Sequence, residues 1–366
     1  MHYIWFVSDI HNQMDDDELV GIAEIAEMAR VSPAAVANWR ARRRGFPEPV
    51  ADLRAGPVFS RAAVRRWLRR QQEEKGRMST VLSTINLKGG VGKTTTTVGI
   101  AEMLVAEHGM RVLVIDLDPQ TNATISLINE HLWKELDEQG LTVAQLFIDA
   151  LSKDPAERRF RLDDAIQTAV GTVSGLRGLD LLPSSLRLIN VQEKIATMPI
   201  GEFSAISASQ ILETAIKRRL NNWDYILIDC PPNLGTVTLN GLRMSNAYLI
   251  PTIPDILSTY GIPQIIKRVR AFADEINEDI PPLGIIVTKY QANSTMHVNT
   301  RERLRQEEEE GKGPHVFETT IPQGNAIAAS ADFTVRGTLR QKYLYQGGYE
   351  AFRDLTTEIV KAVEDM

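Results

Sequence analysis

From about residue 79 onward, short apolar runs and longer amphipathic stretches alternate along the chain. The apolar runs predict strands that are buried on both faces of a sheet, and they lie at residues 81–85, 112–115, 179–182, 225–228 and 283–289. The amphipathic stretches predict helices at residues 95–106, 209–220 and 263–276. Strands that alternate with helices in this way indicate an α/β fold, in which a mostly parallel, doubly wound sheet is flanked by helices.

The N-terminal part has a different pattern, which predicts a small winged helix-turn-helix domain over residues 20–72. Apolar residues recur at helical spacing over residues 22–29, and Ser32-Pro33 is typical of the start of a second helix over residues 34–43. In such domains the second helix enters the major groove of DNA. The wing and a last basic helix are expected at residues 45–49, 53–59 and 60–70.

The same segment is basic although the whole chain is acidic. Residues 22–77 contain thirteen Arg and Lys against six Asp and Glu, a local net charge of +7, whereas the whole chain has a formal net charge of −6. Arginine suits bidentate contacts to phosphate and guanine. The alternative is a small helical oligomerisation domain with a solvated basic face. The candidate DNA contacts are Asn38, Arg40, Arg42, Arg43, Arg44 and Arg54.

A glycine-rich segment at residues 88–95 connects the first predicted strand of the second part to its first helix. Its sequence, Lys-Gly-Gly-Val-Gly-Lys-Thr-Thr, matches the phosphate-loop pattern. Glycines let the backbone approach phosphate oxygens, and the N–H groups of a helix start attract an anion. We expect Lys93 to contact the β- and γ-phosphates and the Thr94 hydroxyl to bind Mg²⁺. The expected nucleotide contacts are Lys88, Gly89, Gly90, Val91, Gly92, Lys93, Thr94 and Thr95.

Carboxylates stand at the ends of two predicted strands. Asp116 ends one strand and is followed by Asp118, and Asp229 ends another. Ligands of open α/β sheets bind beyond the carboxyl ends of the strands. Each acid alone is equally compatible with a helix cap or a solvated loop. Together with the phosphate loop, the three acids favour one shared Mg-nucleotide site.

Composition limits the organisation and the compartment. The 366 residues suffice for a large α/β domain, expected at 79–366, which a polar linker at 73–78 joins to the small domain. Residues 1–19 are expected to be a flexible lead or a non-native start, with Met14 as an alternative first residue. The single cysteine, Cys230, excludes an intramolecular disulfide framework. Since no apolar stretch reaches membrane-spanning length, we expect a cytoplasmic protein.

These motifs resemble the ParA-type DNA-partition ATPases, whose deviant phosphate loop carries a second lysine, here Lys88. The resemblance extends from about Met78 to the C-terminus. It includes residues 116–120, which are similar to switch I of the family, and residues 229–235, which are similar to its Walker B and switch II motifs. The N-terminal domain is similar to MerR- and excisionase-like modules, and its presence resembles the longer plasmid members of the family.

The resemblance implies a role for each candidate residue. Lys88 would reach across a dimer interface to the partner's nucleotide, Lys93 would bind the phosphates, and Asp118 would position or activate the attacking water. The residues implied at Mg²⁺ are Thr94, Asp116 and Asp229. Those implied near the adenine are Thr288, Lys289 and Pro322.

The implied function is a cytoplasmic, nucleoid-associated ATPase that uses ATP and Mg²⁺. It would form a homodimer on ATP binding, bind DNA, and segregate a plasmid or chromosome with a ParB-type partner that stimulates slow hydrolysis. The alternative is a nucleotide-switched transcriptional repressor of its own operon. A Min-like membrane ATPase is not expected, because the C-terminal helix is short and acidic.

Nonspecific DNA binding cannot be transferred from the family residue by residue. Short ParA proteins bind DNA through arginines whose positions correspond here to Asn293, Gln323 and Ala326. Another basic cluster would have to replace them. The candidates are Lys267, Arg268 and Arg270, or Arg336, Arg340 and Lys342.

Overall fold

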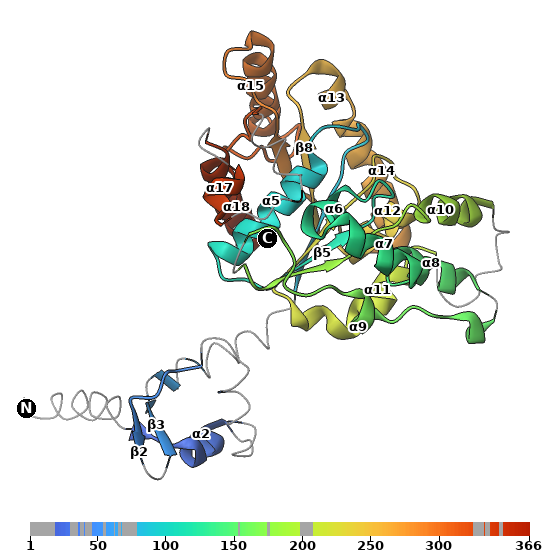
Figure 1. Ribbon diagram of the computed structural model, residues 1–366. Coiled ribbons are helices and arrows are strands. Elements are labelled where there is room, and N and C mark those ends of the chain that lie inside the picture. Colours follow the sequence, from blue (N-terminus) through green and yellow to red (C-terminus); the bar gives the residue numbers. More distant parts are fainter. Residues whose placement is uncertain are drawn as a thin grey trace, which may run out of the picture. The chain divides into compact units, whose positions relative to one another are not determined.

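The computed structural model contains two compact units, Met1–Met78 and Ser79–Met366. Figure 1 labels many of the helices and some of the strands. The structure describes residues 19–29, 36, 40, 46–53, 56–61, 63–64, 67, 79–152, 154–173, 176–197, 208–324, 333, 337–343 and 347–366.

In the first unit, three short strands form an antiparallel sheet beside a helix. In spatial order the strands are β1 (Leu19–Val20), β3 (Gly56–Ser60) and β2 (Ala51–Leu53), and the helix is α2 (Ile22–Ala29). The ring of Phe46 packs edge-on against Phe59 and Trp67, with centroid distances of 5.4 Å and 5.0 Å. This aromatic cluster stabilises a unit that is otherwise small.

The expected helix-turn-helix falls mostly outside the described residues. Arg40 is helical and exposed. The winged helix-turn-helix assignment stays a prediction, although β2 and β3 form a hairpin close to the expected wing. The lead up to residue 18 and the linker at 73–78 also lie outside the described part of the chain, as do the candidate DNA contacts Asn38, Arg42, Arg43, Arg44 and Arg54.

A six-stranded sheet is the frame of the second unit. Its strands in spatial order are β6 (Leu179–Leu182), β5 (Val112–Asp116), β7 (Tyr225–Asp229), β4 (Thr80–Thr84), β8 (Ala247–Thr252) and β9 (Pro282–Val287). Every neighbouring pair is parallel. All residues of β5 and β7 are buried, because helices cover both faces. The predicted doubly wound α/β fold is therefore confirmed.

Each face of this sheet has its own hydrophobic core. Along β5, Leu113 and Ile115 belong to one core and Val112 and Val114 to the other, since side chains alternate along a strand. The first core is covered by α8 (Val143–Leu151), α10 (Leu188–Thr197), α11 (Ile211–Ile216), α12 (Thr236–Met244) and α14 (Ile262–Ile276). The second is covered by α5 (Lys93–Ala106), α6 (Asn122–Leu127), α7 (Glu130–Glu138), α17 (Leu339–Tyr343) and α18 (Gly348–Glu364).

The remaining elements are short or lie at the margin of the sheet. They are η1 (Pro155–Glu157), α9 (Leu162–Ala165), η2 (Lys217–Asn222), α13 (Ile256–Tyr260) and α15 (Thr295–Glu309). A hydrogen bond of 3.0 Å from the Arg303 guanidinium to the Thr259 hydroxyl joins α15 to α13. None of the helices in the described ranges is long and apolar enough to cross a membrane.

Candidate functional site

The turn between β4 and α5 borders a cavity of about 620 Å³. Gly90 and Gly92 have φ angles of 74° and 87°, a left-handed conformation that glycine adopts without steric strain. Helix α5 begins at Lys93, slightly before the predicted start, so the free N–H groups of its first turn directly follow these glycines. This is the geometry of an anion site. The loop residues that line the cavity are Gly89, Gly90, Gly92, Lys93, Thr94 and Thr95.

A side chain at the end of β9 fixes the phosphate loop. The Thr288 hydroxyl donates a hydrogen bond of 2.7 Å to the carbonyl of Val91, and both residues are buried. A Cβ at Gly92 would lie 3.7 Å from the Cβ of Thr288, which is van der Waals contact. The loop is therefore packed against the end of β9, and the two hydrogen-bonded residues are 197 positions apart in the sequence.

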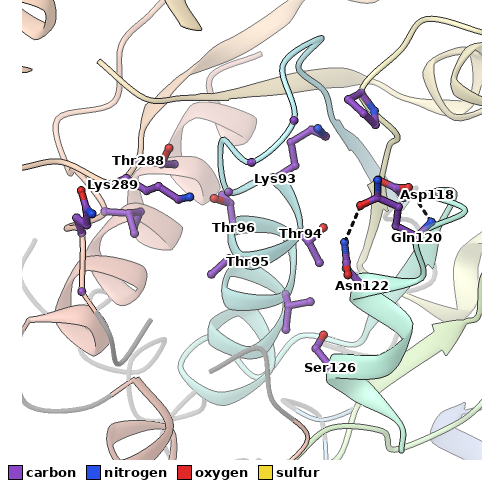
Figure 2. A pocket seen from close by; sticks show the side chains of 18 of the residues that line it. Lys93, Thr94, Thr95, Thr96, Asp118, Gln120, Asn122, Ser126, Thr288 and Lys289 are labelled. Atoms are coloured by element: carbon purple, nitrogen blue, oxygen red, sulfur yellow. Dashed lines mark hydrogen bonds between the residues drawn. The ribbon is translucent and has the colours of Figure 1, made fainter. Parts of the chain in front are cut away.

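The cavity extends to both sides of the first turn of α5 (Figure 2). Thr288 and Lys289 border it on one side, and Asp118, Gln120 and Asn122 border it on the other. The sequence prediction placed the adenine near the first pair and the attacking water near Asp118. The two groups are thus separated by the turn that would hold the phosphates.

Pro322 also lines the cavity, together with Gln323. Pro322 pairs with Tyr290 in an isolated parallel bridge, which keeps the loop after residue 320 beside the end of β9. Tyr343 of α17 contributes a further cavity wall from the C-terminal part of the chain. Pro322 and Tyr343 give the cavity apolar surface next to polar side chains, as is typical of small-molecule sites.

Asp229 connects the end of β7 to the phosphate loop. Its Oδ2 accepts a hydrogen bond of 2.7 Å from the Thr94 hydroxyl, and its Oδ1 accepts one of 3.4 Å from the Thr97 hydroxyl. The carboxyl is buried, and burial raises its pKa to about 7, although the Thr94 hydroxyl and the charge of Lys93 act in the opposite direction. A cation at this point would stabilise the ionised carboxylate.

Asp116 is buried and, like Asp229, is not among the residues that line the cavity. Its Oδ1 accepts a hydrogen bond of 3.0 Å from the backbone N–H of Asp118, and its Oδ2 accepts bonds of 2.9 Å and 2.8 Å from the N–H and hydroxyl of Thr124. Burial, and then the charge of Asp229, raise the pKa of Asp116 well above its usual range. Asp116 therefore holds the loop that carries Asp118, and its predicted link to Mg²⁺ would be indirect.

Asp118 reaches the cavity from that loop. Its Oδ1 accepts a hydrogen bond of 2.9 Å from the N–H of Gln120, and its carbonyl accepts one of 2.7 Å from the Ser184 hydroxyl. Thr121, in the same loop, has a left-handed φ of 59°. The carboxylate is thus held by a tight turn at the border of the cavity, where it can orient a polar molecule.

The two lysines of the phosphate loop point to different places. Lys93 lies in the cavity, where its Nζ is 3.4 Å from the carbonyl of Lys88, and burial lowers its pKa. Lys88 is not among the residues that line the cavity. Its Nζ instead donates a hydrogen bond of 2.8 Å to the Ser258 hydroxyl and lies 3.3 Å from Oδ2 of Asp255.

The donor set of the cavity fits a nucleotide carried with Mg²⁺. Thr94 and Asp229 offer hard oxygen ligands beside the backbone donors of the loop. Proteins typically bind Mg²⁺ in such sites through one or two carboxylates together with substrate phosphates. Burial raises the pKa of both Asp116 and Asp229, and the charge of Lys93 opposes this shift at Asp229. A bound cation would favour the ionised carboxylates further.

One of the basic clusters considered for DNA binding is corrected by the structure. Lys342 is buried, and its Nζ lies 2.7 Å from Oε1 of the buried Glu102, so it cannot contact DNA. In the same cluster, Arg340 is exposed but pairs with Glu350 at 3.2 Å, and residue 336 lies outside the described ranges. In the other cluster, all three side chains are exposed on α14: Lys267, Arg268 and Arg270.

Sequence reasoning missed several residues of the site. Gln120, Asn122 and Ser126 line the cavity together with Asp118, and Tyr343 also lines it. The polar residues directly after Asp118 were a local signal, because both the loop and the first turns of α6 border the cavity. Tyr343 had no such signal, since it reaches the site only through the packing of α17.

Comparisons with known proteins agree with this geometry. A family profile described as an AAA domain matches residues 79–281. The sporulation initiation inhibitor protein Soj of Bacillus subtilis is 30% identical over 246 residues, which cover 67% of this chain and 85% of that protein. The chromosome-partitioning ATPase Soj of Thermus thermophilus is 28% identical over 286 residues, 78% of this chain and 96% of that protein. The structure of cobyrinic acid a,c-diamide synthase from Mycobacterium smegmatis with bound ADP and magnesium is also similar, with a TM-score of 0.56, 26% identity, and coverage of 78% of this chain and 96% of that one.

Proposed function

The chain belongs to the ParA-type family of P-loop ATPases, and on this basis we propose that it hydrolyses ATP with Mg²⁺ to drive the partition of a plasmid or chromosome. The observation that carries the proposal is the cavity itself. It is lined by the glycine-rich turn, by Thr94 and by Asp118, and Thr94 is hydrogen-bonded to the buried Asp229 directly behind it. Phosphoryl transfer depends mainly on such positioning and on charge neutralisation.

We assign a separate role in this reaction to each residue in or next to the cavity. Lys93 would neutralise charge on the β- and γ-phosphates, and Asp118 would orient the attacking water. Thr94 and Asp229 would hold Mg²⁺, which when bound balances negative charge on the phosphates. Asp116 would act through the loop, because its hydrogen bonds hold the backbone of Asp118 in place.

Phosphate release by the purified full-length chain tests the ATPase proposal. We expect turnover that requires Mg²⁺. We also expect Lys93→Ala to lose nucleotide binding and turnover, since Lys93 is the cation of the phosphate loop that lines the cavity, whereas the other lining lysine, Lys289, follows β9. Lys361→Ala is the matched control, because Lys361 is an exposed lysine on α18, outside the cavity. If Lys93→Ala binds and hydrolyses ATP like the control, the assignment of the site is wrong.

We further infer that ATP binding drives homodimerisation, that Lys88 then contacts the partner's nucleotide, and that a ParB-type protein stimulates turnover. The support is the deviant phosphate loop and the likeness to chromosome-partitioning proteins. DNA would be bound nonspecifically by the exposed basic side chains of α14 and specifically by the N-terminal unit. The protein would then act in the cytoplasm, on the nucleoid.

A second candidate function is a nucleotide-switched repressor of its own operon. The local charge of +7 over residues 22–77 and the exposed Arg40 favour it. Footprinting on the DNA upstream of the gene, with and without ATP, tests this function. Protection that changes with the nucleotide supports it, and uniform protection across unrelated sequences contradicts it.

A further inference from the structure

Lys88 is docked on a helix of its own subunit. Its ammonium donates a hydrogen bond of 2.8 Å to the Ser258 hydroxyl and lies 3.3 Å and 3.4 Å from the two oxygens of Asp255. Asp255 is the N-cap of α13, where Oδ1 accepts a hydrogen bond of 2.7 Å from the N–H of Ser258. The Lys88 side chain is 38% exposed, so it lies at the surface of the subunit.

The docking contacts are mutually supporting. The Ser258 hydroxyl also donates a hydrogen bond of 2.9 Å to Oδ2 of Asp255, so three polar groups form a closed cluster. Partial burial by itself would raise the pKa of Asp255, but hydrogen bonds from Ser258 and Lys88 hold it below its usual value. The Asp255 carboxyl is therefore ionised when it binds Lys88.

The helix that holds Lys88 is also unusually apolar on its outer side. Ile256, Leu257 and Tyr260 are 70%, 78% and 74% exposed, the highest values of any large apolar side chain in the described ranges. Figure 1 shows α13 at the margin of the ATPase unit, next to α15. Clustered apolar side chains on a surface typically mark a contact with another protein.

We propose that Asp255 and Ser258 are positioning residues that hold Lys88 on its own subunit, and that a second copy of the chain competes for this lysine when ATP is bound. The inference rests on the proposed ATP-driven dimerisation. Lys88 cannot keep its contacts with Asp255 and also reach the nucleotide of a partner. Docking therefore disfavours the dimer. Dimerisation becomes favourable when the triphosphate of the partner's ATP replaces the Asp255 carboxylate as the binding partner of Lys88.

The same geometry explains why apolar side chains are exposed on α13. Because Lys88 lies directly on α13, a partner close enough to take the lysine must also approach this helix. The second copy would then bury Ile256, Leu257 and Tyr260, which compensates for the lost ion pair. We therefore expect another copy of this chain to bind the surface around Lys88 and α13.

The Asp255→Asn variant isolates the docking contact. Asparagine remains a good N-cap, so α13 keeps its first hydrogen bond while the charge that holds Lys88 is lost. We expect the dissociation constant of the ATP-bound dimer, measured by sedimentation velocity, to fall about two- to five-fold, the range of a partly exposed ion pair. Affinity for fluorescent ADP should not change. Asp224→Asn is the matched control, because it removes a carboxylate that pairs with Arg111 at 3.0 Å, away from Lys88.

Two further variants complete the test. In a Lys88→Ala background, Asp255→Asn should have no effect on dimerisation, since there is no lysine left to release. Leu257→Glu should prevent ATP-dependent dimerisation, whereas Met366→Glu, at an exposed position at the C-terminal end of the chain, should not.

The results separate the inference from the function on which it rests. If the wild-type chain stays monomeric in Mg-ATP, the proposed ATP-driven dimer is wrong and the docking inference fails with it. If the wild-type chain dimerises but Asp255→Asn leaves the dimer unchanged or weakens it, the docking inference alone is overturned. The same holds if Leu257→Glu dimerises normally.

Discussion

Asp116 and Asp229 are direct register partners at the ends of the neighbouring parallel strands β5 and β7. Both carboxyl groups are buried, and the charge of Asp229 is one reason why the pKa of Asp116 is raised. Two acids in this arrangement destabilise the folded chain when both are ionised. This unfavourable free energy arises at the site where the proposed Mg²⁺ would bind.

This pair predicts an unusual dependence of stability on pH. The pKa of each acid is higher in the folded than in the unfolded chain, so the folded state binds more protons between about pH 4 and 7. The free energy of unfolding therefore decreases as pH rises through the folded pKa, which is about 7 for Asp229. Without nucleotide and Mg²⁺, thermal unfolding should therefore occur at higher temperature at pH 6 than at pH 8. One proton contributes at most about 1.4 kcal/mol per pH unit.

The Asp229→Asn variant identifies the source of this effect, because it removes the group with the folded pKa of about 7 and also the charge that raises the pKa of Asp116. It should flatten the difference between pH 6 and pH 8, whereas Asp224→Asn, in an ion pair elsewhere, should keep it. Adding Mg²⁺ and ATP to the wild-type chain should also reduce it, because a cation replaces the protons. An Asp229→Asn curve parallel to that of the wild type would show that other groups titrate.

Asp118→Ala should bind ATP but hydrolyse it about 10²–10⁴-fold more slowly, which is the range for losing a residue that positions or deprotonates the nucleophile. Single-turnover phosphate release checks the chemical step, and fluorescent ATP checks binding. Gln120→Ala is the control, since Gln120 borders the same side of the cavity without a carboxylate. Turnover of Asp118→Ala at the wild-type rate would remove Asp118 from the mechanism.

Lys342→Met should destabilise the ATPase unit by about 3–5 kcal/mol, because it leaves the Glu102 carboxylate buried without its cation. Guanidinium unfolding measures the change. The control is Arg340→Met on the same helix, whose exposed pair with Glu350 should contribute about 1 kcal/mol or less. Combining Lys342→Met with Glu102→Leu should recover much of the loss, and equal effects at positions 340 and 342 would contradict the prediction.

Gly99→Ala should destabilise the protein by about 1–3 kcal/mol, although alanine is the better helix former. A Cβ at this position in α5 would lie 2.4 Å from Cε1 of the buried Phe352 in α18. Denaturant unfolding of Gly99→Ala in a Phe352→Leu background checks the cause, because the smaller side chain should reduce the penalty. Strictly additive effects of the two substitutions would mean that the predicted clash does not determine the loss.

The fragment of residues 14–77 should bind DNA, if the helix-turn-helix prediction is correct. Each phosphate contact adds roughly 0.9 to the slope of log affinity against log salt, so Arg40→Ala should flatten this slope by about one unit. Fluorescence anisotropy over a salt series measures it. A chain without residues 1–77 that still binds the operator would instead favour the alternative of an oligomerisation module.

Much of the site was predictable because its signals are local. The glycine-rich turn, Lys93 and Thr94 are contiguous, and the apolar runs that end in Asp116 and Asp229 identify buried parallel strands by themselves. Periodicity also gave the α/β class, since a buried strand and an amphipathic helix differ in the spacing of their apolar positions. The sequence alone thus determined which segments form the candidate nucleotide site.

The spatial neighbours of these residues depended on the tertiary structure. Only the strand order puts Asp116 directly beside Asp229. Only the approach of α13 to the phosphate loop places Lys88 on Asp255. Only the packing of α17 on α5 buries Lys342 against Glu102. A lysine in the sequence carries the same charge and length at a solvated surface as in a buried pair. Its role was decided by which distant segments the two hydrophobic cores bring next to it, because burial and ion pairing are properties of the packed chain rather than of local spacing.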